Sequence, residues 1–122
     1  MTEREPILDL DALLESVGGD RDLLDELAGT FAEEVPGWVA TLRTAISSGD
    51  SQTVYRVAHG VNGAVGYFKA PRVRQPAAEL EAMGREDRLT DASQALDRLE
   101  DALLELEKFL ASAPWSERRS DG

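Results

Sequence analysis

Apolar residues recur every three or four positions along most of this sequence, which is the repeat of helices with one buried face. Four long segments show the repeat, and short stretches rich in glycine, proline, serine or aspartate separate them. The pattern predicts four long helices and no strand. The apolar positions, segment by segment, are Leu24, Leu27, Phe31, Val35, Trp38, Leu42 and Ile46; Val54, Val57, Ala58, Val61, Val65 and Phe68; Val73, Ala77, Leu80 and Met83; and Leu89, Ala92, Leu96, Leu99, Leu103, Leu106 and Leu110.

A shorter apolar segment precedes these helices. The leucine-rich stretch from Ile7 to Val17 predicts a short helix that Gly18 and Gly19 end. A helix of this length is not stable alone, so we expect it to lie across the end of the other helices and bury its leucines. Asp20 then offers a side-chain acceptor that can cap the first long helix.

Prolines and polar runs set the expected helix boundaries. Pro36 is expected to kink the first long helix near residues 32–35, and residues 47–50, SSGD, predict the next turn. Pro71 fits the first turn of the following helix, although Pro76 favours a regular helix that starts only near residue 75. The polar residues 84–88, GREDR, are expected to form the turn before the last helix.

Four long helices joined by short turns favour an all-α fold, an antiparallel up-and-down four-helix bundle with a short additional N-terminal helix. The leucine repeat from Leu89 to Leu110 would also suit an intermolecular coiled coil. An intramolecular bundle, however, covers the apolar faces of all four helices. We therefore expect a monomer with a single domain over residues 1–112, followed by a disordered tail over residues 113–122, which is polar after Trp115.

The composition narrows the classes of function. The chain has 24 acidic and 13 basic residues and a net charge of −11, which opposes binding to nucleic acid or to anionic membranes. The absence of cysteine excludes a disulfide scaffold and a cysteine metal site. No apolar run is long enough to span a membrane, and the first residues, MTEREP, lack the features of a secretion signal. We expect a soluble, cytoplasmic protein with no nucleic-acid or membrane partner.

The candidate for chemistry is His59, the only histidine in the chain. In the predicted helix it projects about 140° from the centre of the apolar face, which exposes the imidazole. Tyr55, Gly63 and Gly66 lie on the same side. Together with Gly60, these glycines cost the helix roughly 3 kcal/mol relative to alanine, at about 1 kcal/mol each. In return, a glycine beside the ring would let another protein approach closely.

The residues around His59 resemble the phosphorylation-site helix of histidine phosphotransfer (Hpt) domains in two-component phosphorelays. The resemblance rests on Ala58-His59 followed by Gly63, further small residues, an apolar residue and Ala70. It extends over roughly residues 9–110. The flanking residues that carry it are Leu13-Leu14-Glu15, Gly18-Gly19-Asp20, Leu23-Leu24, Gly49-Asp50 and Ala78-Glu79-Leu80-Glu81.

The chain departs from the family pattern at two positions. Asn62 stands where the family usually has a lysine three residues after the histidine, and Lys69 where it usually has a glycine. Asn62 offers only a neutral hydrogen-bond donor beside His59. Lys69 lies about 15 Å along the helix from His59, so Arg56, three residues before the histidine, is the expected nearby cation.

The resemblance implies a phosphocarrier in which His59 is phosphorylated. A neutral imidazole has a free ring nitrogen that can attack phosphorus. The implied partners are the receiver domain of a response regulator, whose aspartate gives or takes the phosphoryl group, and a sensor histidine kinase. The resemblance implies no cofactor, because the magnesium and the acidic pocket belong to the receiver. No phosphate-binding loop occurs in the chain. We therefore expect a phosphocarrier without a nucleotide-binding or kinase site of its own, and not an enzyme.

Other interpretations of His59 stay open at this point. The chain could be a degenerate relative that docks a receiver or a kinase without carrying phosphate, or His59 could be an ordinary surface residue. A metal site is disfavoured because there is no second histidine or cysteine, and a hydrolase triad because no serine elbow occurs. The candidate site residues are His59 as the phosphorylated residue and Tyr55, Arg56, Asn62, Gly63 and Gly66 as neighbours of the phosphate or the partner.

Overall fold

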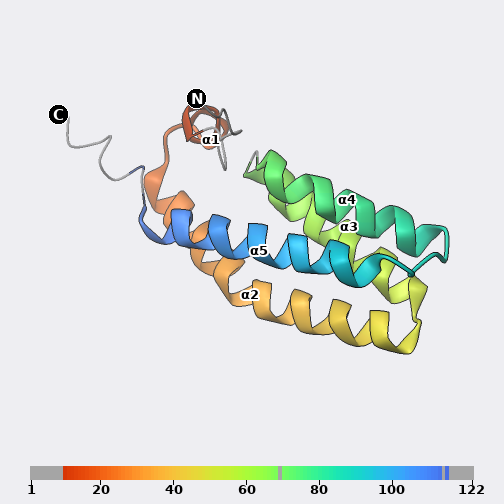
Figure 1. The fold of residues 1–122 in the computed structure, drawn as a ribbon. Helices are drawn as coiled ribbons and strands as arrows, with labels where there is room; N and C mark the ends of the chain where they lie inside the picture. Colours follow the sequence, from red (N-terminus) through yellow and green to blue (C-terminus); the bar gives the residue numbers. More distant parts are fainter. Residues whose placement is uncertain (1–9, 69, 114, 116–122) are drawn as a thin grey trace, which may run out of the picture.

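Five helices make up the part of the chain that the computed structural model describes, which is residues 10–68, 70–113 and 115 (Figure 1). No strand occurs among these residues. The all-α fold class predicted from the apolar pattern is therefore confirmed. The helices are α1 (Leu10–Ser16), α2 (Arg21–Ser48), α3 (Ser51–Tyr67), α4 (Pro71–Arg85) and α5 (Ala92–Ala111).

Helices α2 to α5 pack side by side as an antiparallel bundle (Figure 1). Each packs against its neighbours in the sequence, and α5 closes the bundle by packing against α2. Helix α1 crosses one end of the bundle and is seen nearly along its axis in Figure 1. This is the up-and-down arrangement with an additional N-terminal helix that the sequence predicts.

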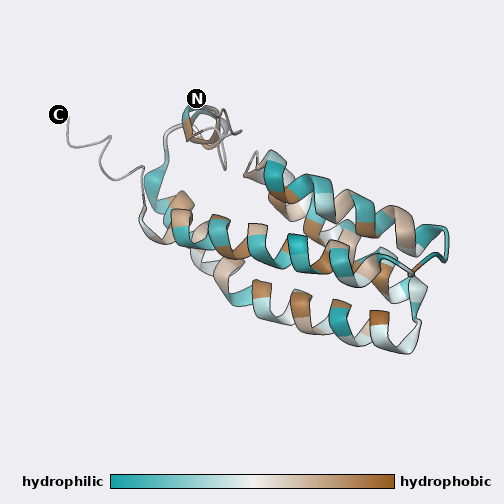
Figure 2. Cartoon of the chain, viewed as in Figure 1, coloured by the Kyte–Doolittle hydropathy of each residue, from teal (hydrophilic) through white to brown (hydrophobic). Residues whose placement is uncertain are grey.

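The core fills the space where the apolar faces of the helices meet. Brown, apolar residues recur along each helix between teal, hydrophilic ones in Figure 2. Among the described residues, no polar or charged side chain is buried. Phe31 of α2 lies edge-on to Phe68, which follows α3, with ring centroids 5.3 Å apart. No described helix is both long and apolar enough to cross a bilayer.

Aspartate caps fix the starts of the two helices that lead to His59. The Asp20 carboxylate accepts a hydrogen bond from the backbone N–H of Leu23 at 3.0 Å and caps α2. Asp50 does the same for α3, where the backbone N–H of Thr53 donates at 3.1 Å. Gly49 lies between the two helices with φ of 75°, a left-handed conformation that glycine adopts without strain. The caps therefore set where α3 begins.

Helix α2 is longer than the sequence pattern predicts. It includes Ser47 and Ser48, so the turn to α3 consists of Gly49 and Asp50 rather than residues 47–50. The side chain of Ser48 donates back to the carbonyl of Ala45 within this last turn. The helix also continues without a break through Pro36. The kink expected near residues 32–35 stays a prediction.

Helix α4 starts earlier than the position of Pro76 predicts. It begins at Pro71, and the backbone N–H groups of Val73 and Arg74 both donate to the carbonyl of Ala70 at 3.2 Å. Pro76 lies inside the helix and is buried, as Val73 is. The predicted start near residue 75 is therefore wrong, because burial of this face stabilises the helix despite the backbone hydrogen bond that proline cannot make.

Gly84 belongs to α4 and not to the predicted turn over residues 84–88. A Cβ built on Gly84 would lie 2.5 Å from the backbone nitrogen of Tyr55 and 2.8 Å from the carbonyl oxygen of Ser51. The backbones of α3 and α4 therefore approach so closely here that only glycine fits. A glycine that the sequence suggests as a turn residue instead permits the contact between two helices.

The packed part of the chain extends to Trp115, which is 1% exposed. Its indole Nε1–H donates to the carboxylate of Asp25 at 2.9 Å, and its carbonyl accepts from Nε of Arg21 at 3.0 Å. A buried aromatic ring three residues beyond the domain boundary predicted after residue 112 thus packs against α2, and the boundary itself stays a prediction. Residues 114 and 116–122 of the predicted tail, and residues 7–9 of the predicted first helix, lie outside the described residues.

Candidate functional site

His59 projects from the middle of α3 toward solvent. Its side chain is 66% exposed, whereas Ala58 and Val61 on the core side of the same helix are fully buried. This is the direction that the helical spacing predicts. The ring is therefore accessible to another molecule.

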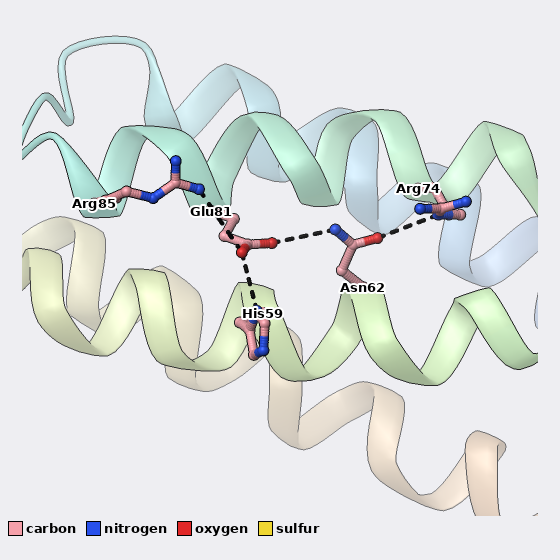
Figure 3. A network of polar contacts seen from close by, with 5 residues as sticks. All are labelled: His59, Asn62, Arg74, Glu81 and Arg85. Carbon is pink, nitrogen blue, oxygen red and sulfur yellow. Dashed lines mark hydrogen bonds and ion pairs between the residues drawn. The ribbon is translucent and has the colours of Figure 1, made fainter.

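Glu81 of α4 holds one nitrogen of this ring. The distance from His59 Nδ1 to Glu81 Oε2 is 2.9 Å. Because an ionised carboxylate can only accept hydrogen bonds, Nδ1 carries the proton and donates it. The second ring nitrogen, Nε2, points away from Glu81 in Figure 3. In a neutral ring with its proton on Nδ1, Nε2 carries the unshared electron pair on the open side, as a nucleophile requires.

The surroundings of Glu81 keep its carboxyl group ionised. The hydrogen bond from His59 lowers the pKa of Glu81 below its ordinary value of 4.5 and outweighs the effect of burial, which raises it. A hydrogen bond from Asn62 and the charge of Arg85 lower the pKa further. The Glu81 side chain is only 14% exposed, so these partners replace the water that a surface carboxylate would have.

Asn62 connects Glu81 to a second residue of α4. Its side-chain N–H donates to Glu81 Oε1 at 3.2 Å, and its side-chain oxygen accepts from Nε of Arg74 at 3.4 Å. Figure 3 shows the resulting row of contacts from Arg74 through Asn62 and Glu81 to His59, with Arg85 on the far side of Glu81. Both polar groups of the Asn62 amide thus form a hydrogen bond, the N–H as donor and the oxygen as acceptor.

Tyr55 lies one turn before His59 and stacks on it. The two ring centroids are 5.8 Å apart with an angle of 21° between the planes. The guanidinium of Arg85 lies 5.9 Å from the centroid of the Tyr55 ring, within the range of a cation–π contact. Tyr55 therefore covers one face of the imidazole and links it to Arg85.

The glycines of α3 leave a bare strip on the helix, formed by Gly60, Gly63 and Gly66. A Cβ added at any of the three would meet no other atom within 4 Å. The packing of this domain therefore does not require glycine at these positions. Gly63, at i+4 from His59, is exposed, so the space beside the ring stays open for a partner.

Arg56 lies apart from this network. It is exposed, and its charge lowers the pKa of Asp50, after the hydrogen bonds from Thr53. Among the described contacts, none joins Arg56 to His59. The arginines in the site network come from α4 instead. Lys69, the other basic residue weighed from the sequence, lies outside the described residues.

The arrangement can support nucleophilic attack by Nε2 of His59. It supplies an exposed imidazole, a carboxylate that fixes the position of its proton, and an aromatic ring that limits its rotation. Among the described residues, no group of three or more histidine, cysteine, aspartate or glutamate side chains is placed to hold a metal ion.

The comparison with known families decides the relationship. The sequence profile of the Hpt domain family matches residues 26–109, the span that contains His59, Asn62, Arg74 and Glu81. The chain belongs to the Hpt domain family. Its fold is also similar to the crystal structure of histidine-containing phosphotransfer protein B (HptB) from Pseudomonas aeruginosa PAO1, with a TM-score of 0.82 and 22% sequence identity. The match covers 89% of this chain and 95% of that one. No curated protein sequence matches this Hpt domain.

The sequence places Glu81 in the Hpt-like pattern, but local spacing does not predict that it is the partner of His59. Local spacing also gives no sign that Arg74 and Arg85 lie near the histidine. A signal for Glu81 was available, because two antiparallel helices joined near residue 69 place residue 59 level with about residue 79. Choosing between Glu79 and Glu81 then requires the direction in which each side chain of α4 points. Only the packed structure supplies that.

Proposed function

We propose that this Hpt domain carries a phosphoryl group on Nε2 of His59 and exchanges it with an aspartate of a response-regulator receiver domain. The observation that carries the proposal is the exposed imidazole whose Nδ1–H is held by Glu81 at 2.9 Å. Membership of a family of phosphocarriers supports it. The cytoplasmic location and the monomeric state predicted from the sequence belong to the same proposal.

The chemistry follows from the proton on Nδ1. The electron pair of Nε2 forms a bond to phosphorus while the bond from phosphorus to the aspartyl oxygen breaks, and the aspartate leaves as a carboxylate. The ring then carries a phosphoryl group on Nε2 and keeps its proton on Nδ1, which makes it positively charged. Glu81 lies against that charge and stabilises it. In the reverse transfer, the ring leaves as a neutral imidazole with its proton on Nδ1.

The partner supplies what this domain lacks. Transfer between a histidine and an aspartate needs a cation near the acidic pocket of the receiver, and we assign that magnesium site to the receiver. The domain contributes the nucleophile on a rigid helix and an open strip beside it, Gly60, Gly63 and Gly66. A receiver or the corresponding domain of a sensor kinase would approach over this face.

A labelling experiment tests the proposal. The wild type is incubated with phosphoramidate, a small donor whose P–N bond breaks as the bond to Nε2 forms, and ammonia leaves. We expect one phosphoryl group per chain, stable in base and labile in acid, and its loss in His59→Gln. Unlabelled wild type under conditions that label a known Hpt domain would refute the proposal.

The alternative is a domain that docks a receiver without carrying phosphate, and it predicts a different result for the same proteins. Asn62 in place of the family's usual lysine motivates it, since the site then has a neutral side chain where a cation is common. Under that alternative, wild type and His59→Gln both bind a receiver and neither carries phosphate. Under the proposal, the wild type carries phosphate and passes it to the receiver, whereas His59→Gln binds without transfer.

A further inference from the structure

A hollow on the surface beside His59 is lined by the residues of the polar network and contains Arg74. Its volume is about 250 Å³, and its lining comprises His59, Asn62, Gly63, Arg74 and Glu81. One water molecule needs roughly 10–15 Å³ in the same measure, so the hollow has room for a phosphoryl group and its three oxygens. It is bordered by the reactive ring on one side and by a guanidinium on another.

Arg74 differs from most of the arginines that the structure describes, because no described carboxylate forms an ion pair with it. Among the described residues, its guanidinium contacts only the side-chain oxygen of Asn62, at 3.4 Å. That contact is long and involves an uncharged acceptor, so it holds the side chain weakly. Arginines that do form ion pairs with a carboxylate are Arg43, Arg72, Arg85, Arg88 and Arg98.

A phosphoryl group on His59 would need a cation close by. It brings up to about two negative charges next to the Glu81 carboxylate, in a chain whose net charge is already −11. Asn62 supplies no charge. Arg85 is engaged by Glu81 at 3.8 Å and by the ring of Tyr55, on the side of Glu81 away from Asn62 (Figure 3).

We propose that Arg74 is the phosphate-binding residue of this site and that Asn62 positions it. When His59 is phosphorylated, the guanidinium exchanges its neutral hydrogen bond with Asn62 for charge-assisted hydrogen bonds to the phosphoryl oxygens. A cation from α4 thereby takes the place of the lysine that the family usually carries on α3. This inference rests on the proposed function and adds a residue to it.

The test compares three variants that each remove one positive charge. Wild type, Arg74→Gln, Arg56→Gln and Arg85→Gln are phosphorylated with phosphoramidate, and the half-life of the phosphohistidine is measured at low and high salt. Arg56 is the matched control, because it is exposed and three residues from His59 but outside the hollow. We expect Arg74→Gln to shorten the half-life about two- to fivefold, the range of an exposed ion pair, and less at high salt.

A second readout reports the contact itself. In a spectrum of arginine side chains, the Nε–H signal of Arg74 should shift on phosphorylation of the wild type, and that of Arg56 should not. Equal half-lives of Arg74→Gln and Arg56→Gln, or a larger loss in Arg85→Gln, would overturn the inference while leaving phosphorylation of His59 intact. A wild type that takes no phosphoryl group would refute the proposed function, and this inference with it.

Discussion

Replacing Glu81 with glutamine should impair phosphorylation at least as much as replacing it with alanine. The ionised carboxylate accepts two hydrogen bonds, from His59 and from Asn62. Glutamine has one accepting oxygen and one donating amide group. If the glutamine oxygen faces His59, its N–H group faces the side-chain N–H of Asn62, and two donors meet. Rotating the Asn62 amide by half a turn removes that clash but turns the Asn62 N–H toward the Nε–H of Arg74, where two donors meet again. If its N–H faces His59 instead, the ring proton moves to Nε2 and blocks the nucleophile.

The size of the effect follows from the bond that is lost. A hydrogen bond to a charged group contributes about 1.5–3 kcal/mol, and the 66% exposure of His59 favours the lower end. Since about 1.4 kcal/mol corresponds to a tenfold change in rate, we expect phosphorylation of Glu81→Gln to be about tenfold slower. Glu81→Ala leaves a gap at a partly exposed position, where water can accept from Nδ1–H, so its loss should be no larger.

The measurement combines rates with the position of the ring proton. Phosphorylation by phosphoramidate gives the rates, and ¹⁵N chemical shifts of His59 show which ring nitrogen carries the proton. Glu79→Gln is the matched control, because Glu79 lies on the same helix but pairs with Arg98 at 2.6 Å, outside the site. A Glu81→Gln protein that is phosphorylated at the wild-type rate with its proton on Nδ1 would show that the carboxylate does not orient the ring.

Three further predictions concern stability, measured by urea unfolding. Gly84→Ala should lower the free energy of unfolding by about 1–3 kcal/mol because its Cβ would meet the α3 backbone; unchanged stability would contradict this close contact. Trp115→Ala should lower it by about 3 kcal/mol, since the ring is 1% exposed; a negligible loss would show that the segment contributes little. Asp50→Asn should destabilise at pH 7, because hydrogen bonds from Thr53 lower the pKa of Asp50 below 3.8. The charge of the Asp50 cap contributes fully to stability above pH 3.8, and this contribution is lost as the pH falls through the lowered pKa. The difference in free energy of unfolding between wild type and Asp50→Asn should therefore shrink in acid, and an unchanged difference would contradict the prediction.

The helices and the exposure of His59 could be predicted because both follow from spacing along one chain. The apolar repeat identifies the buried face of each helix, and a residue opposite that face must point outward. Asp20 and Asp50 cap helices for an equally local reason, since their partners lie three residues away. Such features need no knowledge of what lies across the bundle.

The features that the sequence did not reveal all depend on a second helix. Gly84 and Pro76 are typical of turns by local preference, yet both lie in α4, where contact with α3 or burial in the core determines their conformation. The partnership of Glu81 with His59 depends on the register of α3 against α4. The same register brings Arg74 to Asn62, whereas Arg56, close to His59 in the sequence, has its described electrostatic partner in Asp50.

At the bare strip of α3, residues that would make the helix more stable would also obstruct the approach of a partner. Alanine at Gly60, Gly63 or Gly66 would favour the helix by about 1 kcal/mol each, and no atom of the domain lies within 4 Å to resist the added methyl group. A selection for heat resistance alone would therefore fill these positions early. The proteins that it produced would be harder to unfold but would present a row of methyl groups where, on the proposed function, a receiver must come close.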